Sequence, residues 1–509
     1  MLSIVNSVPM PPCPSPFNMA AHVLRCADDH PDKIAVSVVD RDSAQTLTYG
    51  ALKRAVLGTG GGFLAAGCQP GDMILLRLGN TVDFPIAYLA ALAVGLVPVP
   101  TSAALTEPEV AAIVAELSPR LILRDPNVPS APGAPEIGLA TLRAMRAHAP
   151  ADWHMGDPER LGYVIYTSGT SGRPRAVAHA HRAIWARQMM HDGWYGLRPD
   201  DVLMHAGAFN WTYTLGTGLM DPWTKGATAL IPAAGTPPEA LGPLLAQHRA
   251  TIFAAAPGVY RQMLDRRALR AMPTLRHGLS AGEKMPQTTS DAWRKATGTD
   301  IFEAYGMSEC STFISSCPTT PAAPGALGCP QPGRHIAILG EDGPVPAGTP
   351  GVIAVHRSDP GLMLEYLHAP TDTAARLKGD WFLTGDIGQM SEEGQIIYLG
   401  RNDDMMNAGG YRVSPLEVEA ALADAPGLTG VGATQVEAKP GVFIIAAFYT
   451  APTPLDEAAL RAYVEPKLAR YKHPRAYVHV PKLPTGANGK LVRRRLPLFW
   501  HRQTKAPHA

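Results

Sequence analysis

Short apolar runs alternate with alanine-rich, helix-like stretches along the first third of the chain. Strands and helices that alternate at this spacing are typical of a layered α/β sheet with parallel strands. The expected strands are residues 33–39, 73–78 and 97–100, and the expected helices begin at Thr48 and cover residues 84–96. The pattern therefore predicts a large α/β domain in the N-terminal part of the chain.

An apolar, strand-like run at residues 163–166 breaks into a loop of hydroxyls and glycines. The glycines allow a tight turn that comes close to a ligand, the hydroxyls offer hydrogen-bond donors, and the arginines offer positive charge. These residues are Gly169, Gly172, Ser168, Thr170, Ser171, Arg173 and Arg175. Such chemistry suits a polyphosphate, although the spacing is not that of a Walker A loop. By composition alone, a Ser/Gly-rich surface loop is the alternative.

The length and composition of the chain are those of a globular protein with more than one domain. The chain has 509 residues, of which 46% are hydrophobic and 17% are charged. A formal charge of +1, without a concentrated basic stripe, argues against nucleic acid as a partner. The six cysteines form no CxxC pair, and no apolar run reaches the about 18 residues of a membrane span. We expect a cytoplasmic protein that does not use a membrane, since the N-terminus shows no secretory signal.

The stretch from Tyr166 to Arg175, Tyr-Thr-Ser-Gly-Thr-Ser-Gly-Arg-Pro-Arg, resembles the phosphate-binding signature of the adenylate-forming superfamily. That superfamily includes acyl-CoA synthetases, peptide-synthetase adenylation domains and firefly luciferase. The chain departs from the usual pattern at Arg175 and Ala176, where the family carries Lys and Gly. The resemblance implies that the loop binds ATP through Thr167, Ser168, Gly169, Thr170, Ser171, Gly172 and Arg175, with Thr170 as a catalytic residue.

Further blocks follow in the family's order and imply the remaining nucleotide contacts. Residues 279–283 resemble the stretch whose backbone lies beside adenine in the family, which makes Gly282 and Glu283 candidates for nucleotide binding. Residues 303–309 imply that Tyr305 stacks on adenine, Ser308 meets the α-phosphate and Glu309 holds Mg²⁺ as a catalytic residue. A carboxylate beside phosphate oxygens suits this hard cation. Residues 381–386 and 398–404 imply that Asp386 binds the ribose, since a carboxylate can accept from vicinal hydroxyls, and that Arg401 reaches the same sugar or the phosphate.

Residues 206–216 occupy the place where the superfamily lines its acyl pocket. The resemblance assigns Asn210, Trp211, Gly306 and Met307 to this pocket. Relatives that activate amino acids typically carry an aspartate near position 210, so Asn210 argues against an amino acid as the substrate. Trp211 and the following residues 220–223 look more like medium-chain and aryl acyl-CoA synthetases, with core packing of the indole as the structural alternative.

The last part of the chain resembles the family's small mobile domain. The expected architecture is a large N-terminal domain of layered α/β sheets, residues 1–401, and a small mobile C-terminal α+β domain, residues 402–509. The resemblance places the hinge at Asp403 and the CoA tunnel at Gly409 and Gly410. It makes Lys490 the adenylation lysine, whose ammonium bridges the carboxylate and the α-phosphate as negative charge builds.

The resemblance implies an AMP-forming acyl-CoA synthetase, similar to benzoate–CoA ligases, that uses ATP, Mg²⁺ and coenzyme A. The expected substrate is an aromatic or short-to-medium-chain acid. Two alternatives stay open: an adenylating enzyme that loads a separate carrier protein, and a degenerate nucleotide-binding homologue. The second is motivated by Arg175, Ala176 and an extra residue before Gly489. A homodimer is also compatible with the sequence.

Overall fold

The computed structural model describes residues 1–167, 175–266, 269, 272–408, 411–439, 442–486 and 490–504. The chain divides into two compact units. Unit 1 comprises residues 1–4, 337–354 and 383–509, and unit 2 comprises residues 5–336 and 355–382. The two units are defined by how densely their residues pack on one another. The domain boundary expected near residue 402 concerns motion of the C-terminal part of the chain, and it stays a prediction.

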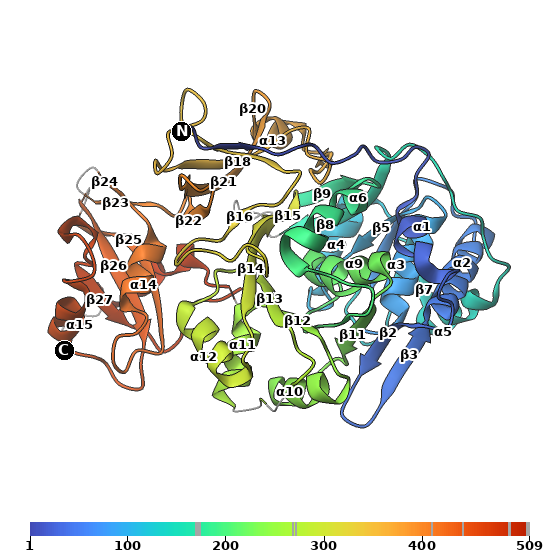
Figure 1. The fold of residues 1–509 in the computed structure, drawn as a ribbon, viewed down its shortest axis with the longest axis horizontal. Coiled ribbons are helices and arrows are strands. Elements are labelled where there is room, and N and C mark those ends of the chain that lie inside the picture. Colours follow the sequence, from blue (N-terminus) through green and yellow to red (C-terminus); the bar gives the residue numbers. More distant parts are fainter. Residues whose placement is uncertain are drawn as a thin grey trace. The chain divides into compact units, whose positions relative to one another are not determined.

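A nine-stranded sheet forms the centre of unit 2 (Figure 1). Its middle strands, from β14 to β2, are all parallel, and its remaining pairs are antiparallel. In spatial order the strands are β16 (Cys329–Pro330), β15 (Ser311–Ser315), β14 (Ile301–Met307), β13 (His277–Ala281), β12 (Ile252–Ala255), β10 (Val202–His205), β11 (Thr228–Pro232), β2 (Ile34–Val39) and β3 (Ala44–Thr48).

Two smaller sheets complete unit 2. Four parallel strands form one of them, in the order β5 (Val97–Pro100), β4 (Met73–Arg77), β6 (Leu121–Arg124) and β7 (Glu136–Gly138). Three antiparallel strands form the other: β19 (Glu365–Tyr366), β9 (Arg175–Ala180) and β8 (Leu161–Thr167). The predicted layered α/β architecture with parallel strands is thus confirmed.

Helices cover these sheets through apolar faces. One core cluster joins α10, α11 and α12 to the nine-stranded sheet through side chains such as Leu244, Tyr260 and Trp293. The longer helices of unit 2 are α2 (Tyr49–Ala65), α3 (Asp83–Ala93), α4 (Glu107–Leu117), α10 (Pro238–Gln247), α11 (Pro257–Asp265) and α12 (Gln287–Thr297). The short ones are α1 (Met19–Val23), α5 (Leu139–Ala144), α6 (Ala183–Ala186), α7 (Gln188–Met190), α8 (Thr212–Leu215), α9 (Asp221–Lys225) and α13 (Pro370–Ala374). Among the described residues, we find no helix with the length and apolarity that crossing a bilayer requires.

Helix α2 begins where the sequence predicts, because Thr48 accepts a hydrogen bond from the backbone N–H of Ala51. Two of its glycines, Gly58 and Gly61, face a neighbouring segment of backbone. A Cβ at Gly58 would lie 2.3 Å from the carbonyl oxygen of Arg146, and one at Gly61 would lie 2.2 Å from that of Ala149. The glycine run is therefore a surface for close packing inside a helix.

A further sheet, most of whose residues belong to unit 1, has β17 (His335–Leu339), β18 (Gly351–His356) and β21 (Trp381–Met390) as neighbours, and β22 (Ile396–Arg401) pairs with β21. The C-terminal part of unit 1 has an α+β core in which α14 and α15 pack on a three-stranded sheet through residues such as Val418, Leu460 and Ile445. The elements here are β23 (Met406–Ala408), β24 (Tyr411–Val413), α14 (Pro415–Leu422), β25 (Gly430–Lys439), β26 (Val442–Thr450), α15 (Glu457–Val464), β27 (Ala476–His479) and α16 (Pro497–Thr504).

Candidate active site

The residues predicted to surround the nucleotide in unit 2 gather at one edge of the nine-stranded sheet. Gly282 and Glu283 directly follow β13, and the 303–309 block ends the adjacent parallel strand β14. The segment with Asn210 and Trp211 follows β10 at the same edge. Carboxyl ends of parallel strands commonly carry the ligand site of an α/β protein. The fold therefore brings together motifs that lie almost a hundred residues apart.

Backbone geometry at this edge requires glycine at two of the predicted positions. Gly282 has φ of 93°, a left-handed conformation that other residues rarely adopt. At Gly306 a Cβ would lie 2.1 Å from the carbonyl oxygen of Ser311, because β14 and β15 approach closely there. The ring of Tyr305 lies edge-on to Phe313, with 5.2 Å between centroids.

Glu309 is held in place by a tyrosine that the sequence analysis did not single out. The Tyr366 hydroxyl donates to Oε1 of Glu309 at 2.6 Å, and both side chains are buried. Burial and the adjacent carboxylate raise the pKa of Tyr366, so the hydroxyl keeps its proton and remains a donor. The tyrosine therefore fixes the direction in which Glu309 presents its other oxygen.

Arg175, which stands where the family usually carries lysine, lies against the ring of Tyr366. Its guanidinium carbon is 4.9 Å from the centre of the Tyr366 ring, and its Nη2 is 3.0 Å from a carboxylate oxygen of Asp372 on α13. A planar guanidinium can stack on a ring in a way that an ammonium cannot. Arg175 is thus held by the ring of Tyr366 and by the carboxylate of Asp372.

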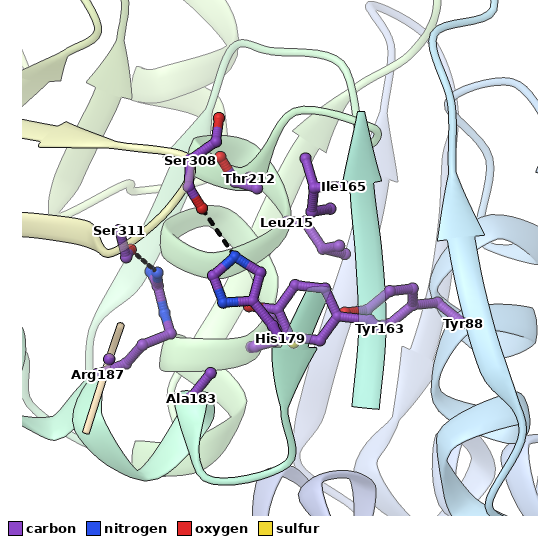
Figure 2. A pocket seen from close by; sticks show the side chains of 12 residues that line it. Tyr88, Tyr163, Ile165, His179, Ala183, Arg187, Thr212, Leu215, Ser308 and Ser311 are labelled. Atoms are coloured by element: carbon purple, nitrogen blue, oxygen red, sulfur yellow. Dashed lines mark hydrogen bonds between the residues drawn. The ribbon is translucent and has the colours of Figure 1, made fainter. Parts of the chain in front are cut away.

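A small cavity opens beside this edge (Figure 2). Aromatic and aliphatic side chains form most of its wall, and a few polar groups face it, as is usual for sites that bind small molecules. Its lining residues are Tyr88, Tyr163, Ile165, His179, Ala183, Arg187, Thr212, Leu215, Met220, Ser308, Ser311 and Gly361. The four residues predicted for the acyl pocket are not among them, but their neighbours Thr212 and Ser308 are.

A buried ion pair lies at one side of the cavity. Arg187 binds both carboxylate oxygens of Asp221, and its Nη1 donates to the hydroxyl of Ser311. The hydroxyl of Tyr195 donates to the same aspartate at 2.8 Å. Burial would lower the pKa of Arg187, but Asp221 outweighs it and raises the pKa. Arg187 therefore stays charged and its charge is neutralised within the protein.

His179 contributes another polar side chain to the cavity wall. Its Nε2 is 2.8 Å from the carbonyl oxygen of Ser308, and its ring stacks on Tyr163 with centroids 4.8 Å apart. Burial lowers its pKa from 6.5 to about 4, so the ring is neutral at pH 7. The sequence places His179 and His181 on one strand but does not indicate that His179 reaches the 303–309 block.

Three of the predicted residues in unit 1 contact one another. Asp386 and Arg401 face each other on paired strands, with 3.2 Å between Arg401 Nη1 and a carboxylate oxygen of Asp386. Arg401 also contacts Asp403 at 3.2 Å. Lys490 is exposed, and its carbonyl oxygen accepts from the backbone N–H of Gly486.

Several predicted residues lie outside the described part of the chain. These are Ser168, Gly169, Thr170, Ser171 and Gly172 of the phosphate loop, and Gly409 and Gly410 of the predicted CoA tunnel. For Thr167 the structure describes the backbone but not the side chain. Their assignments stay predictions, as do the roles assigned to the described residues.

Comparison with known proteins identifies the family. The sequence pattern of the AMP-binding enzyme family matches residues 23–367. A benzoate–CoA ligase of Thauera aromatica is 31% identical over 492 residues, which cover 89% of this chain and 91% of that protein. A 3-hydroxybenzoate–CoA ligase of Aromatoleum sp. (strain CIB) is 29% identical, with 89% and 91% covered. The crystal structure of a benzoate CoA ligase from Burkholderia xenovorans LB400 matches with a TM-score of 0.85 and 27% identity, covering 94% of this chain and all of that one. The resemblance read from the motifs is confirmed, and the chain belongs to the AMP-binding enzyme family.

Proposed function

We propose that this chain is an AMP-forming acid–CoA ligase, which activates an aromatic or short-to-medium-chain carboxylic acid with ATP and transfers the acyl group to CoA. The observation that carries the proposal is similarity along nearly the whole chain to proteins named as benzoate–CoA and 3-hydroxybenzoate–CoA ligases. The arrangement of Tyr305, Ser308 and Glu309 at one sheet edge supports it.

The first half-reaction makes the acid electrophilic. A carboxylate oxygen attacks the α-phosphorus of ATP, the bond from that phosphorus to the bridging oxygen breaks, and pyrophosphate leaves. In our proposal Tyr305 stacks on adenine, Ser308 contacts the α-phosphate, and Asp386 and Arg401 bind the ribose. Lys490 then bridges the carboxylate and the α-phosphate as negative charge builds, which lowers the barrier electrostatically.

Glu309 is the residue that fits Mg²⁺. The described residues contain no cluster of three or more His, Cys, Asp or Glu side chains that could hold a metal ion. Proteins commonly bind Mg²⁺ through one or two carboxylates together with substrate phosphates and water, so a single oriented glutamate suits this cation. When bound, Mg²⁺ supplies positive charge against the phosphate oxygens.

The second half-reaction transfers the acyl group. The thiol of CoA gives up its proton to solvent, its sulfur attacks the acyl carbon, and the bond from that carbon to AMP breaks. We assign Gly409 and Gly410 to the CoA path and Asp403 to the hinge of a domain rotation that withdraws Lys490. One site is thereby used twice, with a conformational step between the two reactions.

Pyrophosphate release from MgATP tests the proposal. The protein is supplied with benzoates, short and medium fatty acids, long fatty acids and amino acids, each with CoA, with a carrier protein, and with neither. Release that depends on an aromatic or short-to-medium acid and turns over fully with CoA supports the ligase. A thioester formed only on the carrier protein would reassign the acceptor, and ATP binding without release from any acid would indicate a degenerate homologue.

A further inference from the structure

The hairpin between β14 and β15 carries Ser308 and Glu309 in its turn, and a residue with an unusual backbone conformation follows the turn. The backbone N–H of Cys310 donates to the carbonyl oxygen of Met307 at 3.2 Å, which closes the turn. Ser311 then begins β15 opposite Met307, with φ of 60°. Residues with a Cβ rarely adopt this left-handed conformation, but short hairpins use it to return the chain to the second strand.

The position of Ser311 sets it apart from other non-glycine residues with a positive φ. Ser118 has φ of 46° and caps the C-terminus of α4, and Arg249 has φ of 51° and lies just beyond α10. The left-handed conformation is common where helices end. Ser311 instead stands beside two residues with proposed roles at the nucleotide. Strained backbone at such a place persists only where neighbouring groups hold it.

Neighbouring elements hold the backbone of the turn. The carbonyl oxygen of Ser308 accepts from Nε2 of His179 at 2.8 Å, and that of Glu309 accepts from the backbone N–H of Met363 at 2.7 Å. The turn is thus fixed on its outer side by β9 and by the segment before β19. A change of φ at Ser311 would move the turn against both contacts.

The side chain of Ser311 is bound to a buried ion pair. Figure 2 shows the hydrogen bond that Nη1 of Arg187 donates to the Ser311 hydroxyl. The other nitrogen atoms of the guanidinium bind Asp221, which is 0% exposed and also accepts from Tyr195. Arg187 therefore offers Ser311 a charged donor with little freedom to move, and such donors make the stronger hydrogen bonds.

We propose that Ser311 is a positioning residue, whose left-handed backbone aims the turn that presents Ser308 and Glu309. Arg187 holds this conformation by donating to the Ser311 hydroxyl, and it is a positioning residue as well. The inference rests on the proposed function, which assigns Ser308 to the α-phosphate and Glu309 to Mg²⁺. Ser311 acts through the turn and is assigned no contact with the substrate or the metal.

Two substitutions remove the same hydroxyl and differ in backbone preference. Ser311→Gly adopts a positive φ without strain and needs no hydroxyl to hold it, whereas Ser311→Ala keeps a Cβ that disfavours this φ. Pyrophosphate release should fall about 10- to 100-fold in Ser311→Ala and stay within about threefold of the wild type in Ser311→Gly, since misplacing reacting groups by about 1 Å can cost about 100-fold. Equal losses in both variants would overturn the proposal, because the hydroxyl itself would then be the acting group.

A second half-reaction and a matched control separate positioning from a general loss of stability. Thioester formation from supplied acyl-adenylate releases no pyrophosphate and should be unchanged in both variants, while the half-saturating Mg²⁺ concentration should rise in Ser311→Ala alone. Ser118→Gly and Ser118→Ala repeat the pair at an exposed left-handed residue outside the site, and both should keep the wild-type rates. Equal loss of both half-reactions in Ser311→Ala would contradict the positioning role.

Arg187→Lys tests whether this arginine acts through Ser311. Lysine keeps a positive charge for Asp221 but lacks the planar fork that reaches a second acceptor. We expect adenylation to slow about 10-fold in the single variant and to fall no further when the substitution is added to Ser311→Gly, since two residues that act through one contact are not additive. A full additional loss in the double variant would show that Arg187 acts by another route.

Calorimetric ATP binding with and without Mg²⁺ keeps this inference separate from the proposed function. If no acid supports pyrophosphate release, the ligase proposal fails, and Mg²⁺ should still tighten ATP binding more in the wild type and Ser311→Gly than in Ser311→Ala. Equal tightening in all three proteins would overturn the inference. Full turnover by Ser311→Ala would overturn it too, while the ligase proposal would stand.

Discussion

Removing one hydroxyl from Tyr366 tests whether this residue orients Glu309 toward the metal. In Tyr366→Phe the ring stays, so the contact with the Arg175 guanidinium is kept. The variant loses the 2.6 Å hydrogen bond to Oε1 of Glu309, a carboxylate that is 8% exposed. A hydrogen bond to a charged group is worth about 1.5–3 kcal/mol. A tenfold change in affinity corresponds to about 1.4 kcal/mol, so we expect a 10- to 100-fold loss of apparent Mg²⁺ affinity.

The assay is pyrophosphate release as a function of free Mg²⁺ at saturating acid and ATP, together with ATP binding with and without Mg²⁺. Tyr49→Phe is the control, because its buried hydroxyl also makes a 2.6 Å hydrogen bond, to the backbone carbonyl of Ala227 in the same unit. The control should lose stability and keep its Mg²⁺ dependence. An unchanged half-saturating Mg²⁺ concentration in folded Tyr366→Phe would refute the orienting role, and equal shifts in both variants would indicate a general loss of stability.

Three further substitutions test other parts of the description. Lys490→Ala should lower adenylation by about 10²–10³-fold while thioester formation from supplied acyl-adenylate survives, and equal loss of both half-reactions would contradict the two-step use of the site. Asp221→Asn leaves the buried charge of Arg187 without its partner and should cost about 3–5 kcal/mol in denaturant unfolding, more than an exposed ion pair would. Burial raises the pKa of Glu303 from 4.5 to about 7, so its ionisation opposes folding and stability falls as pH rises between these values. Glu303→Gln should therefore gain about 3 kcal/mol relative to the wild type at pH 8 and nothing near pH 4, measured by chemical denaturation; an equal gain at both pH values would show that the charge is not responsible.

Local patterns predicted much of the fold because they depend on neighbouring residues. The strand at Val97–Pro100 and the helix start at Thr48 follow from apolar alternation and from a capping hydroxyl, and both are found in the structure. The expected helix over residues 84–96 ends three residues earlier, at Ala93, where the chain turns toward the next strand.

The contacts that shape the candidate site could not be read from the sequence. Glu309 and Tyr366 are 57 residues apart, and Arg187 and Asp221 are 34 residues apart. No periodicity links such pairs, since the strands and turns between them decide whether they meet. A signal was available for Asp221, because a carboxylate inside an apolar stretch that ends in Trp223 implies a buried partner.

The glycines of α2 make the usual route to a more stable helix unsafe in this protein. Each glycine costs the helix about 1 kcal/mol relative to alanine, so Gly→Ala is a standard stabilising change in exposed helices. At Gly58 and Gly61 the added methyl group would meet carbonyl oxygens closer than 2.5 Å, and a backbone cannot move aside as a side chain can. Selection for thermal stability should therefore leave these two glycines untouched, because this face of α2 packs directly on the backbone of Arg146 and Ala149.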